Sequence, residues 1–302
     1  MILNPFELYT IPLEEWLKPI INVLVDRFDP FLQATIGTPV GWVVNSFEFF
    51  LQEIPPTIFL IILGLLAWQF MGGKMAIYSI VALSFVGFIG AWPEAMTTLS
   101  VTIAAVIFCF ALGIPLGILA ARNNLIESIL LPILDTMQTL PPFVYLVPVV
   151  MLFGVGAVPG TIVTVIAALP PLIRLTNVGI RQVSPEIVAG AFALGATANQ
   201  VLWSIQIPLA MPTILVGANQ TILRALSMVV VASMIAVRGL GMMVLKGIGL
   251  LNIESAIVGG IGIVAIAILL DRCTQALGQP QKIPWQQRGL VGLLLSIKLK
   301  IR

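Results

Sequence analysis

Long apolar runs separated by short polar stretches dominate the pattern of this chain. Seven runs predict helices that cross or enter a bilayer, near residues 56–71, 75–92, 97–121, 142–156, 158–178, 212–237 and 252–272. The fourth run is short against the roughly 20 residues of a typical span, so we expect it to be tilted, broken or extended by its flanks. The pattern predicts an all-α polytopic membrane protein with about seven transmembrane helices.

Two segments before these runs are amphipathic rather than uniformly apolar. Over residues 11–30, apolar side chains recur at helical spacing with charged side chains between them, which predicts a helix lying in the membrane interface. Residues 40–53 repeat this pattern more weakly, and packing on the transmembrane body explains it as well as lipid contact does. We divide the chain into an N-terminal interfacial segment 1–55, two accessory transmembrane helices 56–92, a core transmembrane domain 93–275 and a basic tail 276–302.

The composition requires lipid as the solvent and excludes several classes of function. Hydrophobic residues make up 59% of the chain and charged residues 9%, against about 25% charged residues in soluble domains. The absence of histidine and the presence of only two cysteines exclude a disulfide framework and an ordinary zinc site. The sequence has no basic cluster for nucleic acid and no phosphate-binding G-x-x-x-x-G-K-[ST] loop. We therefore expect no cofactor on this chain, and any ATP hydrolysis on another.

Basic residues indicate the orientation in the membrane. If the loop 179–211 is cytoplasmic, ten lysines and arginines lie on the cytoplasmic side and four outside, while Arg224 falls within a span. The positive-inside rule then places the N-terminus outside and the C-terminus in the cytoplasm. In that orientation the basic tail lies against anionic lipid head groups.

The loop between the fifth and sixth apolar runs predicts a compact, rigid structure. Pro185 suits the first turn of a helix, and Glu186 complements the positive end of its dipole. Gly195 can adopt the positive φ that ends such a helix. We expect a second short helix from Asn199, stopped by Pro208. A rigid loop of this kind passes on the movement of a partner, whereas a flexible loop would absorb it.

The spacing of this loop resembles the signature of ABC importer permeases, in which glutamate-alanine-alanine precedes a glycine and isoleucine-x-leucine-proline follows. Aligned on Gly195, the family's acidic residue falls at Ala189, and Phe192 stands where a basic residue is common; Glu186 can supply the charge one turn earlier. The resemblance implies coupling helices that sit in a cleft of a cytoplasmic ATPase. Within the loop 184–208 it assigns this role to Glu186, Ala189, Gly190, Ala191, Phe192, Gly195, Ile205, Ile207 and Pro208.

Strings along nearly the whole chain resemble the permease subunit of glycine betaine/proline betaine importers, at residues 135–139, 143–148, 168–177, 208–214, 225–230, 232–237 and 258–260. The resemblance implies the type I ABC importer permease fold in the bacterial cytoplasmic (inner) membrane. It also implies a second copy of this chain, two ATPase subunits that use ATP and Mg, and an external substrate-binding protein. It leaves the solute open among glycine betaine, proline betaine, choline and carnitine.

Polar and aromatic side chains inside the spans are candidates for a translocation pathway, because aromatic faces suit a quaternary ammonium. Hydrogen bonds between helices are the competing explanation for each of them. Arg224 costs about 3 kcal/mol at mid-span, and the family has an apolar residue there. Contact with a substrate carboxylate competes with snorkelling or a bond to a nearby carbonyl. The candidates are Gln138, Phe143, Tyr145, Asn219, Gln220, Arg224, Ser227 and Met228.

Two other functions compete with the importer hypothesis. A secondary carrier or osmotically gated channel for the same solutes would need ionisable groups inside the spans, and Arg224 is the clear instance in the sequence. A non-transporting scaffold would not need a rigid loop or spans broken by proline. Co-purification of an ATPase distinguishes the importer from both alternatives.

Overall fold

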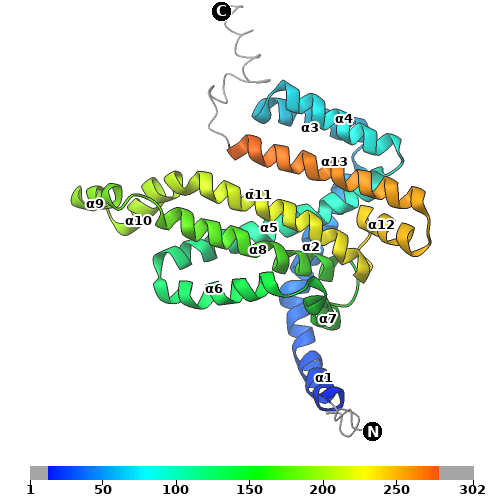
Figure 1. The fold of residues 1–302 in the computed structure, drawn as a ribbon, viewed down its shortest axis with the longest axis horizontal. Helices are drawn as coiled ribbons and strands as arrows, with labels where there is room; N and C mark the ends of the chain where they lie inside the picture. Colours follow the sequence, from blue (N-terminus) through cyan, green and yellow to red (C-terminus); the bar gives the residue numbers. More distant parts are fainter. Residues whose placement is uncertain (1–12, 279–302) are drawn as a thin grey trace, which may run out of the picture.

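The computed structural model describes residues 13–278, and every regular element in that range is helical (Figure 1). The α-helices are α1 (Leu13–Leu32), α2 (Thr38–Glu53), α3 (Pro56–Met71), α4 (Gly73–Phe88), α5 (Trp92–Arg122), α6 (Asn124–Thr139), α7 (Pro142–Phe153), α8 (Ala157–Arg181), α9 (Pro185–Ala193), α10 (Ala198–Val201), α11 (Ile207–Ala232), α12 (Leu240–Gly249) and α13 (Ile253–Gly278). Two π-helical turns, Gln33–Gly37 and Leu202–Gln206, and one 3₁₀ turn, Ser233–Ile235, complete the described chain.

Within residues 13–278, four helices are long and apolar enough to cross a bilayer, or six if each of two bent pairs counts as one span. The bends are 106° between α2 and α3 and 100° between α6 and α7. The predicted runs 56–71 and 142–156 fall in these pairs, and 75–92 is the shorter helix α4. The other four runs match the long helices, which are Trp92–Arg122, Ala157–Arg181, Ala198–Ile235 and Ile253–Ala276. The all-α polytopic architecture is confirmed.

The structure corrects the predicted start of the sixth run. Pro208 does not stop a short helix; it lies in the first turn of α11, where its missing N–H would have no helical partner in any case. The turn Leu202–Gln206 joins α10 directly to α11, so one helical span extends over Ala198–Ile235. The prediction near residue 212 was therefore too late, because proline is compatible with the beginning of a helix as well as with its end.

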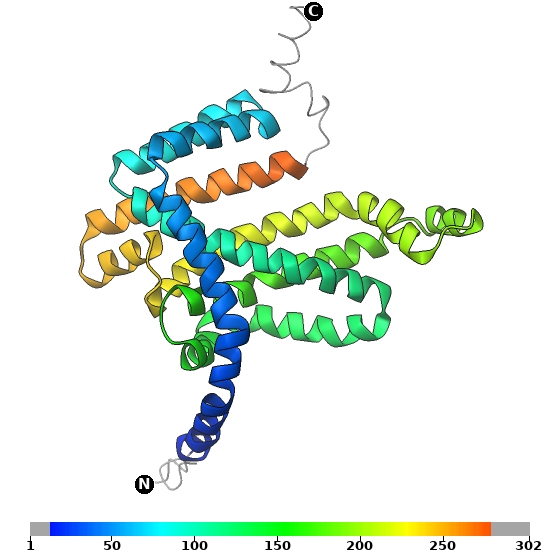
Figure 2. The same ribbon diagram turned by 180° about the vertical axis from the view of Figure 1, so that it is seen from behind.

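Helix α8 forms the centre of the bundle, with α5 on one side and α11 on the other (Figure 1, Figure 2). Glycines allow the close approach of these backbones. A Cβ at Gly117 of α5 would lie 2.5 Å from Cβ of Thr176, and one at Gly217 of α11 would lie 2.9 Å from Cβ of Leu175. Small residues at such crossings are characteristic of helices packed in membranes. Helices α3, α4 and α13 form a second group beside this centre.

The N-terminal helices run across the others rather than along them (Figure 2). Helix α2 packs on α5 and α8, with Val40 and Val44 buried against Val101 and Val229. Packing on the transmembrane body therefore explains one face of the segment 40–53, while Trp42 on another face is 72% exposed. Residues 1–12 and the basic tail from 279 to 302 lie outside the described residues.

Candidate functional site

The loop 184–208 has the compact shape that its sequence predicts. Pro185 begins α9, with Glu186 in the first turn. Gly195 has φ +84° and ends the turn after α9, where the N–H of Ala196 donates to the carbonyl of Ala191 at 3.1 Å. This left-handed glycine cap is a common way to end a helix. The predicted first helix and glycine turn are present, while the predicted second helix is the beginning of the continuous span Ala198–Ile235.

The second half of the loop is fixed to the bundle. Thr197 and Gln200 form a reciprocal capping box at the start of α10. Leu202 is 2% exposed and packs with Leu172 of α8 in a buried cluster. Arg122, at the end of α5, donates from Nη1 to Oδ1 of Asn199 at 3.1 Å. The loop is thus connected to three long helices, so a force on it reaches the centre of the bundle.

The exposed surface of the loop includes four large apolar side chains. The exposed fractions are 49% for Ile187, 48% for Phe192, 91% for Leu194 and 61% for Trp203. All four residues belong to one loop at one end of the molecule, with α12 at the opposite end (Figure 1). Large apolar side chains grouped in this way are typical of a surface that a partner covers.

A polar network holds α6 against the C-terminal half of α8. Glu127 Oε2 forms an ion pair with Nη2 of Arg181 at 2.8 Å, and Glu127 Oε1 accepts from Nδ2 of Asn177 at 2.8 Å. Arg181 Nε also donates to Oδ1 of Asn177, and its Nη2 donates to the carbonyl of Ala120 in α5. A second ion pair joins Asp135 of α6 to Arg174 of α8. These contacts tie three helices together beside the loop 184–208.

Five of the eight predicted pathway residues line one cavity between α6, α7, α8 and α11. The cavity has a volume of about 200 Å³, several times the ~30 Å³ that one molecule occupies in liquid water. We call it the Arg224 cavity. The predicted residues in its wall are Gln138, Tyr145, Arg224, Ser227 and Met228, and the residues that sequence reasoning missed are Met137, Leu140, Pro142, Ala167 and Val231.

Arg224 is the one charged residue in the wall of this cavity. Its side chain is exposed, and within the described part of the chain its guanidinium forms neither a hydrogen bond nor an ion pair. A bond to a neighbouring carbonyl, one of the alternatives considered above, is therefore absent among the described residues. A charge at mid-span costs about 3 kcal/mol unless a cavity or partner solvates it, and the cavity provides that environment.

The remaining three pathway candidates lie outside this cavity. Phe143 is 52% exposed near the start of α7, and Gln220 is exposed on α11 one turn before Arg224. Asn219 donates from Nδ2 to Oδ1 of Asp271 at 3.2 Å, which joins α11 to α13. For Asn219 the structure thus favours the helix–helix hydrogen bond over a pathway role.

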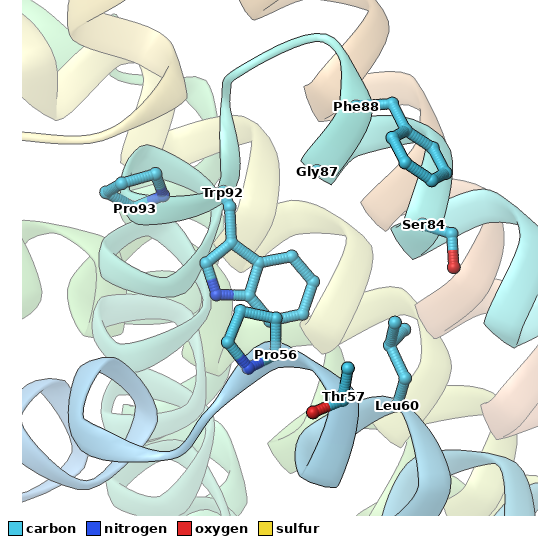
Figure 3. A pocket seen from close by; sticks show the side chains of 8 residues that line it. All are labelled: Pro56, Thr57, Leu60, Ser84, Gly87, Phe88, Trp92 and Pro93. Carbon is cyan, nitrogen blue, oxygen red and sulfur yellow. The ribbon is translucent and has the colours of Figure 1, made fainter.

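A larger hollow lies elsewhere and has a different chemistry. It has a volume of about 390 Å³ between α3, α4 and the start of α5 (Figure 3). None of its eight lining residues is charged. The ring of Trp92 forms part of the wall and contacts the ring of Phe59 edge to face, with 5.7 Å between the ring centroids. Ligand cavities hold a few polar groups that fix the orientation of the ligand, so the Arg224 cavity is the better candidate. The lining residues are Pro56, Thr57, Leu60, Ser84, Gly87, Phe88, Trp92 and Pro93.

Curated relatives match nearly the whole chain. The glycine betaine/proline betaine transport system permease protein ProW of Escherichia coli (strain K12) is 49% identical over 97% of this chain and 84% of its own length. The glycine betaine/carnitine transport permease protein GbuB of Listeria monocytogenes serotype 1/2a (strain 10403S) is 41% identical over 90% of this chain and 98% of its own length. The glycine betaine transport system permease protein OpuAB of Bacillus subtilis (strain 168) is 37% identical over 88% of this chain and 95% of its own length.

The fold is also found in a solved transporter structure. An inward-facing structure of the MetNI methionine ABC transporter contains a chain that superimposes with a TM-score of 0.51 at 19% identity, covering 60% of this chain and 92% of that chain. The similarity supports the type I ABC importer permease fold. The model of the family described as binding-protein-dependent transport system inner membrane component matches residues 113–280. On the family match and the identity to its relatives together, the chain belongs to the inner membrane components of binding-protein-dependent transport systems.

Proposed function

We propose that this chain is the transmembrane permease subunit of an ATP-driven importer for quaternary-amine osmolytes such as glycine betaine or proline betaine. The observation that carries the proposal is the 49% identity, over 97% of the chain, to a permease named for these two solutes. The Arg224 cavity supports it, because its wall combines an aromatic ring, two methionines and polar groups in a membrane-embedded position.

The same proposal assigns the partners. The chain pairs with a second copy of itself, binds two cytoplasmic ABC ATPase subunits through the loops 184–208, and receives solute from an external binding protein. The exposed apolar side chains of the loop, such as Phe192, support the docking of a partner. ATP and Mg are used by the ATPase subunits, while the N-terminus lies outside and the C-terminus in the cytoplasm.

The mechanism is alternating access. ATP-driven closure of the ATPase subunits moves the two loops 184–208 together, and the attached helices rock until the pathway between the two copies faces outward. Solute then enters from the docked binding protein, and hydrolysis restores the inward-facing state. The Arg122–Asn199 hydrogen bond and the buried Leu202 support this step, because they attach the loop to α5 and to the α8–α11 pair.

Uptake into reconstituted vesicles tests the proposal. Vesicles that contain this chain and the ATPase, supplied with binding protein, are expected to accumulate labelled glycine betaine with ATP and not with a non-hydrolysable analogue. A secondary carrier or osmotically gated channel would move the solute in vesicles that contain this chain alone. Nucleotide-independent uptake by the isolated chain would therefore refute the importer assignment.

A further inference from the structure

We propose that Arg224 makes this permease selective for quaternary amines that bear a carboxylate, by binding the carboxylate in the Arg224 cavity while the trimethylammonium group lies against Tyr145 and the methionines. The inference rests on the proposed function and names the part of the solute that the cavity recognises. It concerns this chain's own wall residues and not the external binding protein.

The charge of the cavity wall favours an anionic group. The ten lining residues include one cation, Arg224, and no aspartate or glutamate. The acidic residue in α6 closest in sequence to the lining residue Gln138 is Asp135, and its carboxylate is already paired with Arg174 of α8. The positive charge of Arg224 is therefore not neutralised by a carboxylate of the described chain.

The three arginines of the neighbouring helices α5 and α8 all have partners in the described chain. Arg122 donates to Asn199, Arg174 pairs with Asp135, and Arg181 pairs with Glu127. Arg224 differs in having neither a hydrogen bond nor an ion pair within residues 13–278, although it is the most deeply placed along its apolar helix. A planar guanidinium offers two parallel N–H donors that match a carboxylate in geometry and charge.

The rest of the wall suits the opposite end of the solute. Tyr145 on α7 presents an aromatic ring to the cavity, and Met137 and Met228 add polarizable thioethers. Aromatic faces attract quaternary ammonium groups, and the attraction strengthens where water is excluded. Gln138 and Ser227 complete the wall with neutral hydrogen-bonding groups. One compact cavity thus holds groups for both ends of a betaine.

This arrangement predicts a specific discrimination. Glycine betaine and carnitine carry a carboxylate that neutralises Arg224. Choline has a hydroxyl in its place and a net positive charge, so it leaves the guanidinium unpaired and is repelled by it. The wild-type permease is therefore expected to prefer the first two solutes over choline even when no binding protein contributes to the choice.

Direct binding to the purified permease–ATPase complex, without binding protein, tests the inference. The experiment measures how well unlabelled carnitine or choline displaces labelled glycine betaine. It compares the wild type with the variants Arg224→Leu, Arg224→Lys and Arg272→Leu. A hydrogen-bonded charge pair corresponds to a loss of about tenfold or more in glycine betaine affinity for Arg224→Leu, with a smaller loss for Arg224→Lys. Arg272 is exposed on α13 outside the cavity, so Arg272→Leu is expected to match the wild type.

The displacement by choline decides whether the inference holds. The inference is supported if choline displaces labelled glycine betaine much less effectively than carnitine in the wild type, and nearly as effectively as carnitine in Arg224→Leu. The role of Arg224 would be overturned if wild type and Arg224→Leu bound glycine betaine equally well. It would also be overturned if the affinity for choline relative to carnitine were the same in both proteins. ATP-dependent uptake by the same wild-type preparation in vesicles is measured in parallel. Absence of ATP-dependent uptake would refute the proposed function. Normal uptake together with an unchanged affinity for choline relative to carnitine would refute the Arg224 inference alone.

Discussion

Replacing Glu127 by alanine is expected to destabilise the permease by removing one of the two acidic residues that join α6 to α8 through ion pairs. Two contacts are lost, the ion pair with Arg181 and the hydrogen bond from Nδ2 of Asn177. Asn177 is only 2% exposed, so its side-chain amide donor would lose its partner where water cannot easily replace it. Arg181 keeps its bonds to Asn177 and to the Ala120 carbonyl.

The two losses differ in size. An unsatisfied buried donor costs about 1–3 kcal/mol. The ion pair adds at most about 1 kcal/mol, because the side chains of Arg181 and Glu127 are 33% and 24% exposed. The total of about 1–4 kcal/mol corresponds to a fall of about 2–16 °C in the melting temperature, at about 2–4 °C for each kcal/mol in a large domain. Thermal unfolding of the purified permease, followed by a fluorescence-detected size-exclusion assay, measures the shift.

Two further variants separate the contributions. Glu127→Gln keeps an acceptor for Asn177 and removes the charge, so the melting temperature is expected to fall by at most about 4 °C. Ser128→Ala, on the same exposed turn of α6, is the control and is expected to melt within about 2 °C of the wild type. A melting temperature for Glu127→Ala equal to that of Ser128→Ala would refute the stabilising role of Glu127 between the two helices.

Three other predictions follow from the loop and the helix crossings. Gly195→Val is expected to cost about 1–2 kcal/mol of strain at φ +84° and to reduce ATPase co-purification, while Gly195→Asn retains more; equal recovery of ATPase with both would contradict this. Gly117→Val is expected to lower the melting temperature because its side chain would overlap Thr176, whereas Gly190→Ala, with nothing within 4 Å, leaves it unchanged. Phe192→Ala is expected to leave stability unchanged and to weaken ATPase binding about tenfold, measured by titration; unaltered binding would exclude Phe192 from the interface.

Local sequence signals predicted the first half of the loop 184–208 well. Proline at the first turn and glycine at the last specify the ends of a helix through their own backbone chemistry, and Pro185 and Gly195 do so here. Pro208 was ambiguous, because the same residue is compatible with a helix that ends before it and with one that begins at it. The π-helical turn at Leu202–Gln206, which decides between the two, has no distinctive composition.

The cavity was predicted only in part, because it depends on contacts between distant segments. Arg224 could be identified from the sequence, since a charge inside an apolar run is unusual wherever the run lies in the fold. Met137 and Ala167 could not, because apolar side chains in apolar helices carry no local sign of the wall they join. The 100° bend between α6 and α7, which brings Gln138 and Tyr145 to one cavity, was expected only as a short or broken span.

The continuous helical span Ala198–Ile235 has a mechanical consequence. At Gly217 it crosses α8 so closely that an added Cβ would lie 2.9 Å from Cβ of Leu175. At 1.5 Å per residue, the arm from Gly217 to the start of the span measures about 28 Å, and the arm from Gly217 to Arg224 about 10 Å. A tilt about this crossing would turn a displacement at the start of the span into one about a third as large, and opposite in direction, beside Arg224. By the lever rule, a force applied at the start of the span would act over a shorter distance, and more strongly, beside Arg224.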